Sequence, residues 1–138
     1  AERRRLGCCW WCLCSCGDEL PEIEAKDLLA LTKTDEKEDI SRMNDSQALP
    51  QILDVRNGFE YRGGHIRGAR HCQYLLPCDF VSRVEAMSLD AGRPVYVICL
   101  SAHRSIGAVR ALQSIGFDAR HLRGGMQAWR KEKYPESK

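Results

Sequence analysis

From Leu20 onward, apolar residues fall either in short continuous runs or at helical spacing. The continuous runs predict strands at 51–55, 69–72, 95–98 and 119–122, and the run at 95–98 is the strongest. The helically spaced sets predict helices at 21–31, 58–62, 79–88 and 105–115, and a short helix after Gly124 and Gly125 that contains Met126 and Trp129. Ser105 is the expected N-terminal cap of the fourth helix, and Gly116 its end. Strands that alternate with helices indicate an α/β domain with a mostly parallel sheet.

Two segments lack this patterning. Residues 32–50 are polar and are expected to form a surface insertion. Residues 1–19 form a basic head, expected to be flexible, that carries an arginine triplet and five closely spaced cysteines: Cys8, Cys9, Cys12, Cys14 and Cys16.

Three interpretations of the head stay open. It is a flexible tail or a junction with a longer chain, a membrane-surface anchor acylated on its cysteines, or a thiolate site for zinc or copper. The stretch that follows the arginine triplet is cysteine-rich and too short for the apolar region expected of a secretory signal. The chain starts with Ala, which is typical of a fragment or a processed product.

Composition narrows the class of protein. With 43 % hydrophobic and 29 % charged residues, the 138-residue chain has the composition of one globular domain. A net charge of +2 argues against a nucleic-acid partner, and no apolar run is long enough to span a membrane as a helix. Only three of the eight cysteines lie in the body, which favours a reducing compartment, the cytoplasm.

The strand at 95–98 leads directly into the candidate chemistry. Cys99 follows it, and a short loop then reaches Arg104 and a helix N-terminus. Loop amides and the helix N-terminus are expected to stabilise a thiolate on Cys99, and Arg104 offers a fork for oxyanions. This arrangement predicts a sulfur nucleophile that faces an anionic substrate. The structural alternative is a buried, inert cysteine at a strand end.

Three stretches identify a family resemblance. ILDVRNGFEYRGGHIRGARH, VYVICLSAHRSIGAVRAL and GFDARHLRGGMQAW resemble, in order and spacing, the signatures of rhodanese-like domains. The resemblance covers about residues 20–135. It implies a three-layer α/β domain with a central, mostly parallel five-stranded sheet flanked by helices.

The resemblance also implies an activity, thiosulfate sulfurtransferase. Cys99 would take the outer sulfur of thiosulfate or a related small anionic donor as a persulfide, and a thiol or cyanide would then remove it. No cofactor or metal is implied. The substrate would be held by the loop residues, which are Leu100, Ser101, Ala102, His103, Arg104 and Ser105.

The loop departs from the family pattern at two positions. Ala102 stands where many members have Gly, and a positive φ there would cost about 1 kcal/mol. His103 replaces what is often a small apolar residue, and it either adds positive charge near the substrate or points to solvent.

Several residues outside the loop are secondary candidates. Arg56, Glu60 and Arg70 are placed at the rim of the site, although Asp54 and Arg56 are also expected to tie the strand end to its neighbouring loops. Cys72 and Cys78 are either ordinary thiols or partners that resolve the Cys99 persulfide as a disulfide.

Two other functions compete with sulfur transfer. One is a non-catalytic, rhodanese-like binding or regulatory module of a larger protein, which the presence of both Cys99 and Arg104 disfavours. The other is an oxyanion reductase or phosphatase. The related dual-specificity phosphatases carry a loop one residue longer than the six residues from Cys99 to Arg104, which disfavours that alternative.

Overall fold

Five parallel strands form a single sheet in the computed structural model, which describes residues 19–33 and 49–138. The strand order is β1-β5-β4-β2-β3, and every neighbouring pair is parallel. The strands are β1 (Glu22–Ile23), β2 (Gln51–Asp54), β3 (Arg70–His71), β4 (Val95–Ile98) and β5 (Ala119–Leu122). The predicted fold class is therefore confirmed.

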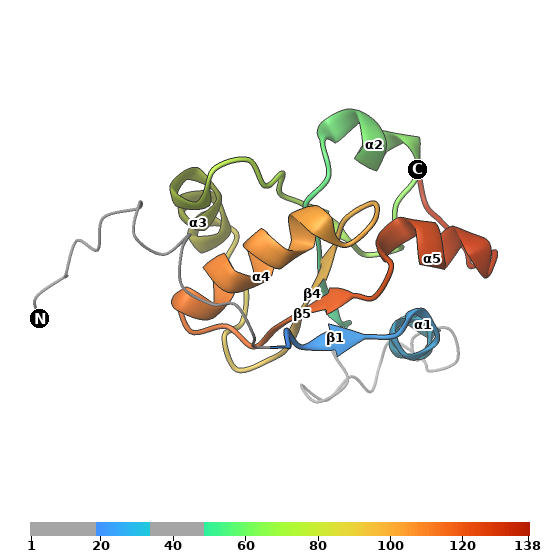
Figure 1. Cartoon of the computed structure of the whole chain (residues 1–138), viewed down its shortest axis with the longest axis horizontal. Coiled ribbons are helices and arrows are strands. Elements are labelled where there is room, and N and C mark those ends of the chain that lie inside the picture. The colour runs from blue at the N-terminus through green and yellow to red at the C-terminus, as the bar shows by residue number, and fades with distance from the viewer. Residues whose placement is uncertain (1–18, 34–48) are drawn as a thin grey trace, which may run out of the picture.

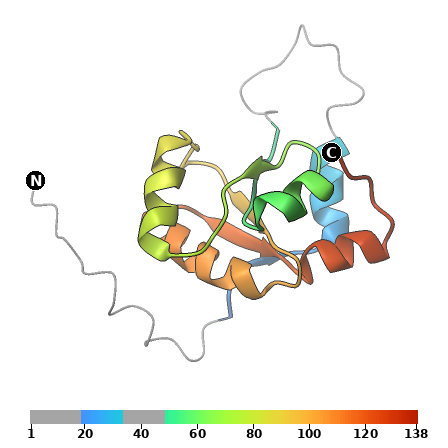
Figure 2. The same cartoon turned by 90° about the horizontal axis from the view of Figure 1, so that it is seen from above.

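Helices cover both faces of the sheet and complete three layers (Figures 1 and 2). The helices are α1 (Ala25–Lys33), α2 (Gly58–Gly63), α3 (Pro77–Ala86), α4 (His103–Ser114) and α5 (Gly125–Lys131). Phe80 of α3 and Val109 of α4 belong to the apolar cluster on one face, whereas Leu28 of α1 and Trp129 of α5 belong to the cluster on the other.

Strand β4 lies at the centre of the sheet between β5 and β2. All four of its residues are buried, because apolar side chains face a packed layer on each side of the sheet. A central strand with two ordered neighbours is a rigid support. It fixes the position of Cys99, the residue that follows it at the carboxyl edge.

Two local predictions are wrong. The expected helix at 21–31 begins only at Ala25, because Glu22–Ile23 pairs with β5 as an edge strand, where His121 N–H donates to Pro21 O and Arg123 N–H to Ile23 O. Ser105 is not the cap of α4. The N-cap is Ala102, and the Ser105 hydroxyl donates to the Ala102 carbonyl instead of accepting from an N–H group.

Some predictions lie outside the described residues. The cysteines of the head and nearly all of the polar insertion at 32–50 fall there, so their structure, the metal and acylation hypotheses and the domain boundary near residue 20 stay predictions. Within 19–33 and 49–138, no helix combines the length and the apolar character needed to cross a membrane.

Candidate active site

Cys99 sits at the carboxyl end of β4, at the start of the loop that leads into α4. Its side chain is 2 % exposed, and its thiol donates to the Ser105 hydroxyl oxygen at 3.4 Å. Ser105, also buried, donates in turn to Ala102 O at 3.0 Å. Because a hydroxyl can rotate to donate in either direction, Ser105 can also hold a thiolate on Cys99.

The carbonyl groups at the start of this loop are held by the first turn of α5. Met126 N–H donates to Cys99 O at 2.8 Å, and Gln127 N–H donates to Leu100 O at 3.0 Å. In a trans peptide the N–H points opposite to the C=O of the same unit, so the N–H groups of Leu100 and Ser101 point away from α5. Within the described residues, neither of these two N–H groups donates to a backbone carbonyl. These two successive N–H groups are the donors expected of an anion-binding nest, which stays a prediction.

Ala102 closes the loop in a left-handed conformation, with φ 74° and ψ −2°. This is the positive φ that the sequence analysis considered for a position where many family members have Gly. The conformation is costly for a residue with a Cβ. It turns the chain from the loop into the 12-residue helix α4, whose N-terminus adds positive potential beside Cys99.

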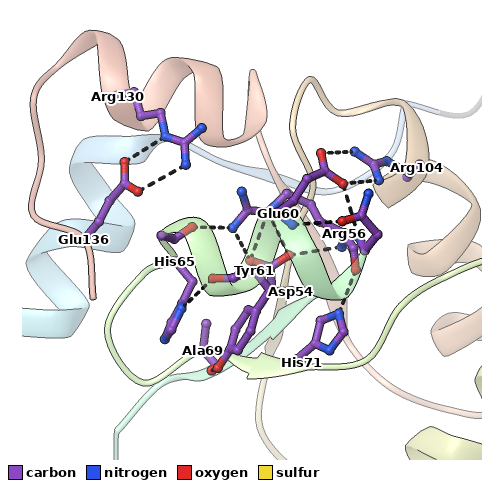
Figure 3. A network of polar contacts seen from close by, with 12 residues as sticks. Asp54, Arg56, Glu60, Tyr61, His65, Ala69, His71, Arg104, Arg130 and Glu136 are labelled. Carbon is purple, nitrogen blue, oxygen red and sulfur yellow. Dashed lines mark hydrogen bonds and ion pairs between the residues drawn. The ribbon is translucent and has the colours of Figure 1, made fainter. Parts of the chain in front are cut away.

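Arg104 is bound by Glu60 of α2, a contact that the sequence did not specify. Its two Nη atoms donate to the two carboxylate oxygens at 2.8 and 2.9 Å (Figure 3). The Arg104 hydrogen bond holds the pKa of Glu60 at about 2, below its ordinary value of 4.5, against the opposing effect of burial. The two Nη groups of Arg104, which were expected to bind an oxyanion, thus already donate to a carboxylate of the protein.

Arg56 is a structural residue in this fold. Its guanidinium is 1 % exposed and donates to both carboxylate oxygens of Asp54, at distances from 2.8 to 3.1 Å, and to Gly64 O at 2.7 Å. Figure 3 shows this pair beside Glu60. Arg56 therefore ties the end of β2 to the turn after α2, which is the second role that the sequence analysis gave it.

The two remaining candidates, His103 and Arg70, lie on different elements. His103 is the first residue of α4 and is exposed, with Nδ1 3.0 Å from the Ser101 hydroxyl oxygen. Arg70 lies on β3, and its guanidinium donates to Met87 O at the end of α3. Arg70 is therefore held at the end of α3, and its place at the rim of the site stays a prediction.

Sheet register separates Cys72 from Cys99. Asp54 lies opposite both Ile98 and His71, so each cysteine follows a residue that pairs with the same position of β2. With β2 between them, their Cα atoms are about 10 Å apart at ordinary strand spacing, whereas a disulfide needs less than about 7 Å. Cys72 is therefore an ordinary buried thiol in this conformation, and burial raises its pKa.

The role of the α5 N-terminus was not predicted from the sequence. Gly125 has φ +59°, and a Cβ built there would lie 2.4 Å from Cys99 O, so only glycine lets α5 approach this closely. The paired glycines at 124 and 125 were the available signal, but their contact with Cys99 joins segments that are far apart in the sequence.

Comparisons of the sequence with known proteins all point to one family. Residues 36–132 match the family model of the rhodanese-like domain. A thiosulfate sulfurtransferase GlpE from Pseudomonas fluorescens is 39 % identical over 80 residues, which cover 57 % of this chain and 69 % of that protein. A probable adenylyltransferase/sulfurtransferase MoeZ from Mycobacterium tuberculosis is 34 % identical over 62 % of this chain but only 21 % of its own length.

Solved structures give the same result. The rhodanese-like domain of an Anabaena protein superimposes with a TM-score of 0.66 at 29 % identity, covering 86 % of this chain and 80 % of that one. A rhodanese-related protein from Thermoplasma volcanium gives a TM-score of 0.62 at 27 % identity, covering 85 % and 97 %.

Proposed function

The chain belongs to the rhodanese-like domain family, and from that membership we propose that it is a sulfurtransferase that carries sulfur on Cys99. In the first half-reaction the Cys99 thiolate attacks the outer sulfur of thiosulfate. The S–S bond of the donor breaks, and its electron pair leaves with sulfite. Cys99 then holds the sulfur as a persulfide.

The second half-reaction regenerates the enzyme. A thiol or cyanide attacks the outer sulfur of the persulfide and leaves with it, and the Cys99 thiolate is released. Two half-reactions through one covalent intermediate predict ping-pong kinetics. The N–H groups of Leu100 and Ser101 and the N-terminus of α4 would stabilise the negative charge that stays on the sulfur throughout.

One observation carries this proposal: the peptide groups around Cys99 are oriented. Their carbonyls are bonded to α5, their N–H groups point away from it, and α4 begins four residues after Cys99. A cysteine that only fills the core needs no such arrangement. The short loop, six residues from Cys99 to Arg104, supports sulfur transfer over a phosphatase reaction, which would need room for the larger phosphate.

The experiment combines intact mass with cyanolysis. The reduced chain, incubated with thiosulfate alone, is expected to gain one sulfur atom, and added cyanide is expected to release thiocyanate with turnover. Cys99→Ser should lose both effects, while Cys72→Ser, which removes a buried thiol of the same apolar cluster, should keep both. No adduct from a folded, reduced sample with thiosulfate or an alkyl persulfide would contradict the proposal and favour a binding module.

A further inference from the structure

The charge of Arg104 is balanced before any substrate arrives. The Glu60 carboxylate meets both of its Nη groups in a bidentate pair, the strongest geometry available to these two side chains. Glu60 is 23 % exposed and Arg104 36 % exposed, so the pair lies at the protein surface and is accessible from solvent. An incoming anion therefore meets a guanidinium and a carboxylate together.

Glu60 is held in place by a second set of bonds. Asn57 N–H donates to Glu60 Oε2 at 3.2 Å, and Glu60 N–H donates to the Asn57 side-chain oxygen at 2.8 Å, which forms a capping box at the start of α2. The same carboxylate thus caps α2 and binds Arg104. With a pKa of about 2, it stays ionised at every pH at which the enzyme would be assayed.

Two neighbouring arginines are also paired with carboxylates that neutralise their charge. Figure 3 shows three guanidinium–carboxylate pairs near one another at this edge of the domain. They are Arg56 with Asp54, Arg104 with Glu60, and Arg130 with Glu136. Each pair sums to zero formal charge, and Cys99 as a thiolate adds one negative charge. Arg104, whose charge interacts with that of Cys99, therefore gives a dianion little net attraction while Glu60 neutralises it.

We propose that Glu60 is a specificity-determining residue that acts through Arg104 and disfavours dianionic sulfur donors relative to donors with at most one negative charge. This inference rests on the proposed sulfurtransferase function. The donor class that it favours is the persulfide of a thiol, R–S–SH. The Cys99 thiolate attacks the outer sulfur and the S–S bond breaks. The thiolate R–S⁻ leaves with the electron pair, and the proton stays on the transferred sulfur.

Glu60→Gln isolates the charge from the positioning. The one amide oxygen of glutamine can still accept from Asn57 N–H and from one Nη of Arg104, as Glu60 Oε2 does, so the substitution removes the negative charge and one of the two Arg104 hydrogen bonds. Asp118→Asn is the matched control. Asp118 pairs with Arg120 at 2.9 Å on the surface, and it precedes β5, at the opposite edge of the sheet from Cys99.

The measurement is kcat/KM for thiosulfate and for an uncharged-chain alkyl persulfide at low ionic strength. Glu60→Gln should raise kcat/KM about fivefold for thiosulfate and change it by less than about twofold for the neutral R–S–SH donor, because the repulsion removed scales with donor charge. The gain should appear in KM rather than kcat, and should shrink as salt screens the charges. Asp118→Asn should change neither donor by as much as twofold.

A second measurement needs no variant. Between about 10 mM and 0.3 M salt, kcat/KM of the wild-type chain for thiosulfate should fall by less than about twofold, because the balanced charges attract a dianion only weakly. A steep fall would indicate a net positive site and would overturn the inference. The inference would also be overturned if the folded Glu60→Gln variant had the same ratio of kcat/KM for thiosulfate and the persulfide as the wild-type chain.

Removal of the Arg104 charge, alone and together with that of Glu60, completes the design. Arg104→Gln should reduce kcat/KM for thiosulfate more than for the persulfide, and the Glu60→Gln/Arg104→Gln double variant should return the donor ratio to within twofold of wild type. If the double variant has the same ratio of kcat/KM for the two donors as the Arg104→Gln single variant, the inference is contradicted. Failure of every donor to load sulfur onto wild-type Cys99 would instead contradict the proposed function.

Discussion

Met126 N–H donates to the carbonyl oxygen of Cys99 at 2.8 Å, which joins the first turn of α5 to the residue proposed to carry the sulfur. The two residues are far apart in the sequence, and the contact depends on Gly125 between α5 and the loop. The helix that begins here thus determines which way the first peptide groups of the loop point. This contact leads to the first prediction.

Gly125→Ala should disrupt the loop as well as the fold. The substitution places a Cβ 2.4 Å from Cys99 O at a residue with positive φ. The expected loss of unfolding free energy is about 2–5 kcal/mol, from the left-handed conformation and the overpacking together. Denaturant unfolding measures the loss, and sulfur loading of Cys99 should fall even under conditions where the variant is folded. Gly116→Ala, at a positive φ with open space around the Cβ, controls for the conformational cost alone.

Ala102→Gly should stabilise the protein. Ala102 adopts φ 74°, and glycine relieves a steric cost of about 1 kcal/mol there. Ala30→Gly, in the exposed part of α1, should lower stability by about 0.5–1 kcal/mol. Equal effects of the two substitutions on the denaturant midpoint would contradict the argument from backbone conformation.

Asp54→Ala should be strongly destabilising. It would leave the Arg56 guanidinium, 1 % exposed, without its carboxylate, at a cost of about 3–5 kcal/mol. Asp54→Ala/Arg56→Met should recover part of that loss, because no unpaired charge then stays buried. Asp118→Ala, which breaks an exposed pair, should cost at most about 1 kcal/mol in the same unfolding experiment.

The Glu60–Arg104 pair should make stability depend on pH in the acid range. The folded-state pKa of Glu60, about 2, lies below the ordinary value of 4.5, so the folded state binds its proton less readily than the unfolded chain. The contribution is therefore fully present above about pH 5 and is lost as the pH falls toward 2. The stability difference between wild type and Glu60→Gln should be about 1 kcal/mol at pH 6 and close to zero near pH 2. A difference that stays constant from pH 6 to pH 2 would show that the charge contributes nothing.

Cys72 should behave as an inert thiol. It is 3 % exposed, and burial raises its pKa, so iodoacetamide at neutral pH should leave it unmodified until the chain unfolds. Mild oxidation of the sulfur-loaded chain should give no Cys72–Cys99 disulfide, because β2 separates the two residues. Peptide mapping by mass spectrometry after alkylation checks both points.

Much of the domain could be predicted from local pattern. Four of the five strands and the helices after residue 57 were placed from apolar runs, helical spacing and glycine ends, because these signals act between neighbours in the chain. The strand at Glu22–Ile23 was missed, since two residues have no periodicity and their extended conformation is set by pairing with β5. The Ser105 cap was wrong for a similar reason: the turn at Ala102 begins the helix three residues earlier.

The sequence by itself determined the fold class, and it predicted the nucleophile and the loop that follows it. Each is encoded in contiguous residues, from the buried run of β4 through Cys99 to Arg104. Only the tertiary structure decided that Glu60 balances the charge of Arg104, that α5 holds the carbonyls of the loop, and that Cys72 is too far from Cys99 to bond with it. These relationships join residues from separate strands and helices, and sequence spacing carries no information on such distances until the sheet order and register are fixed.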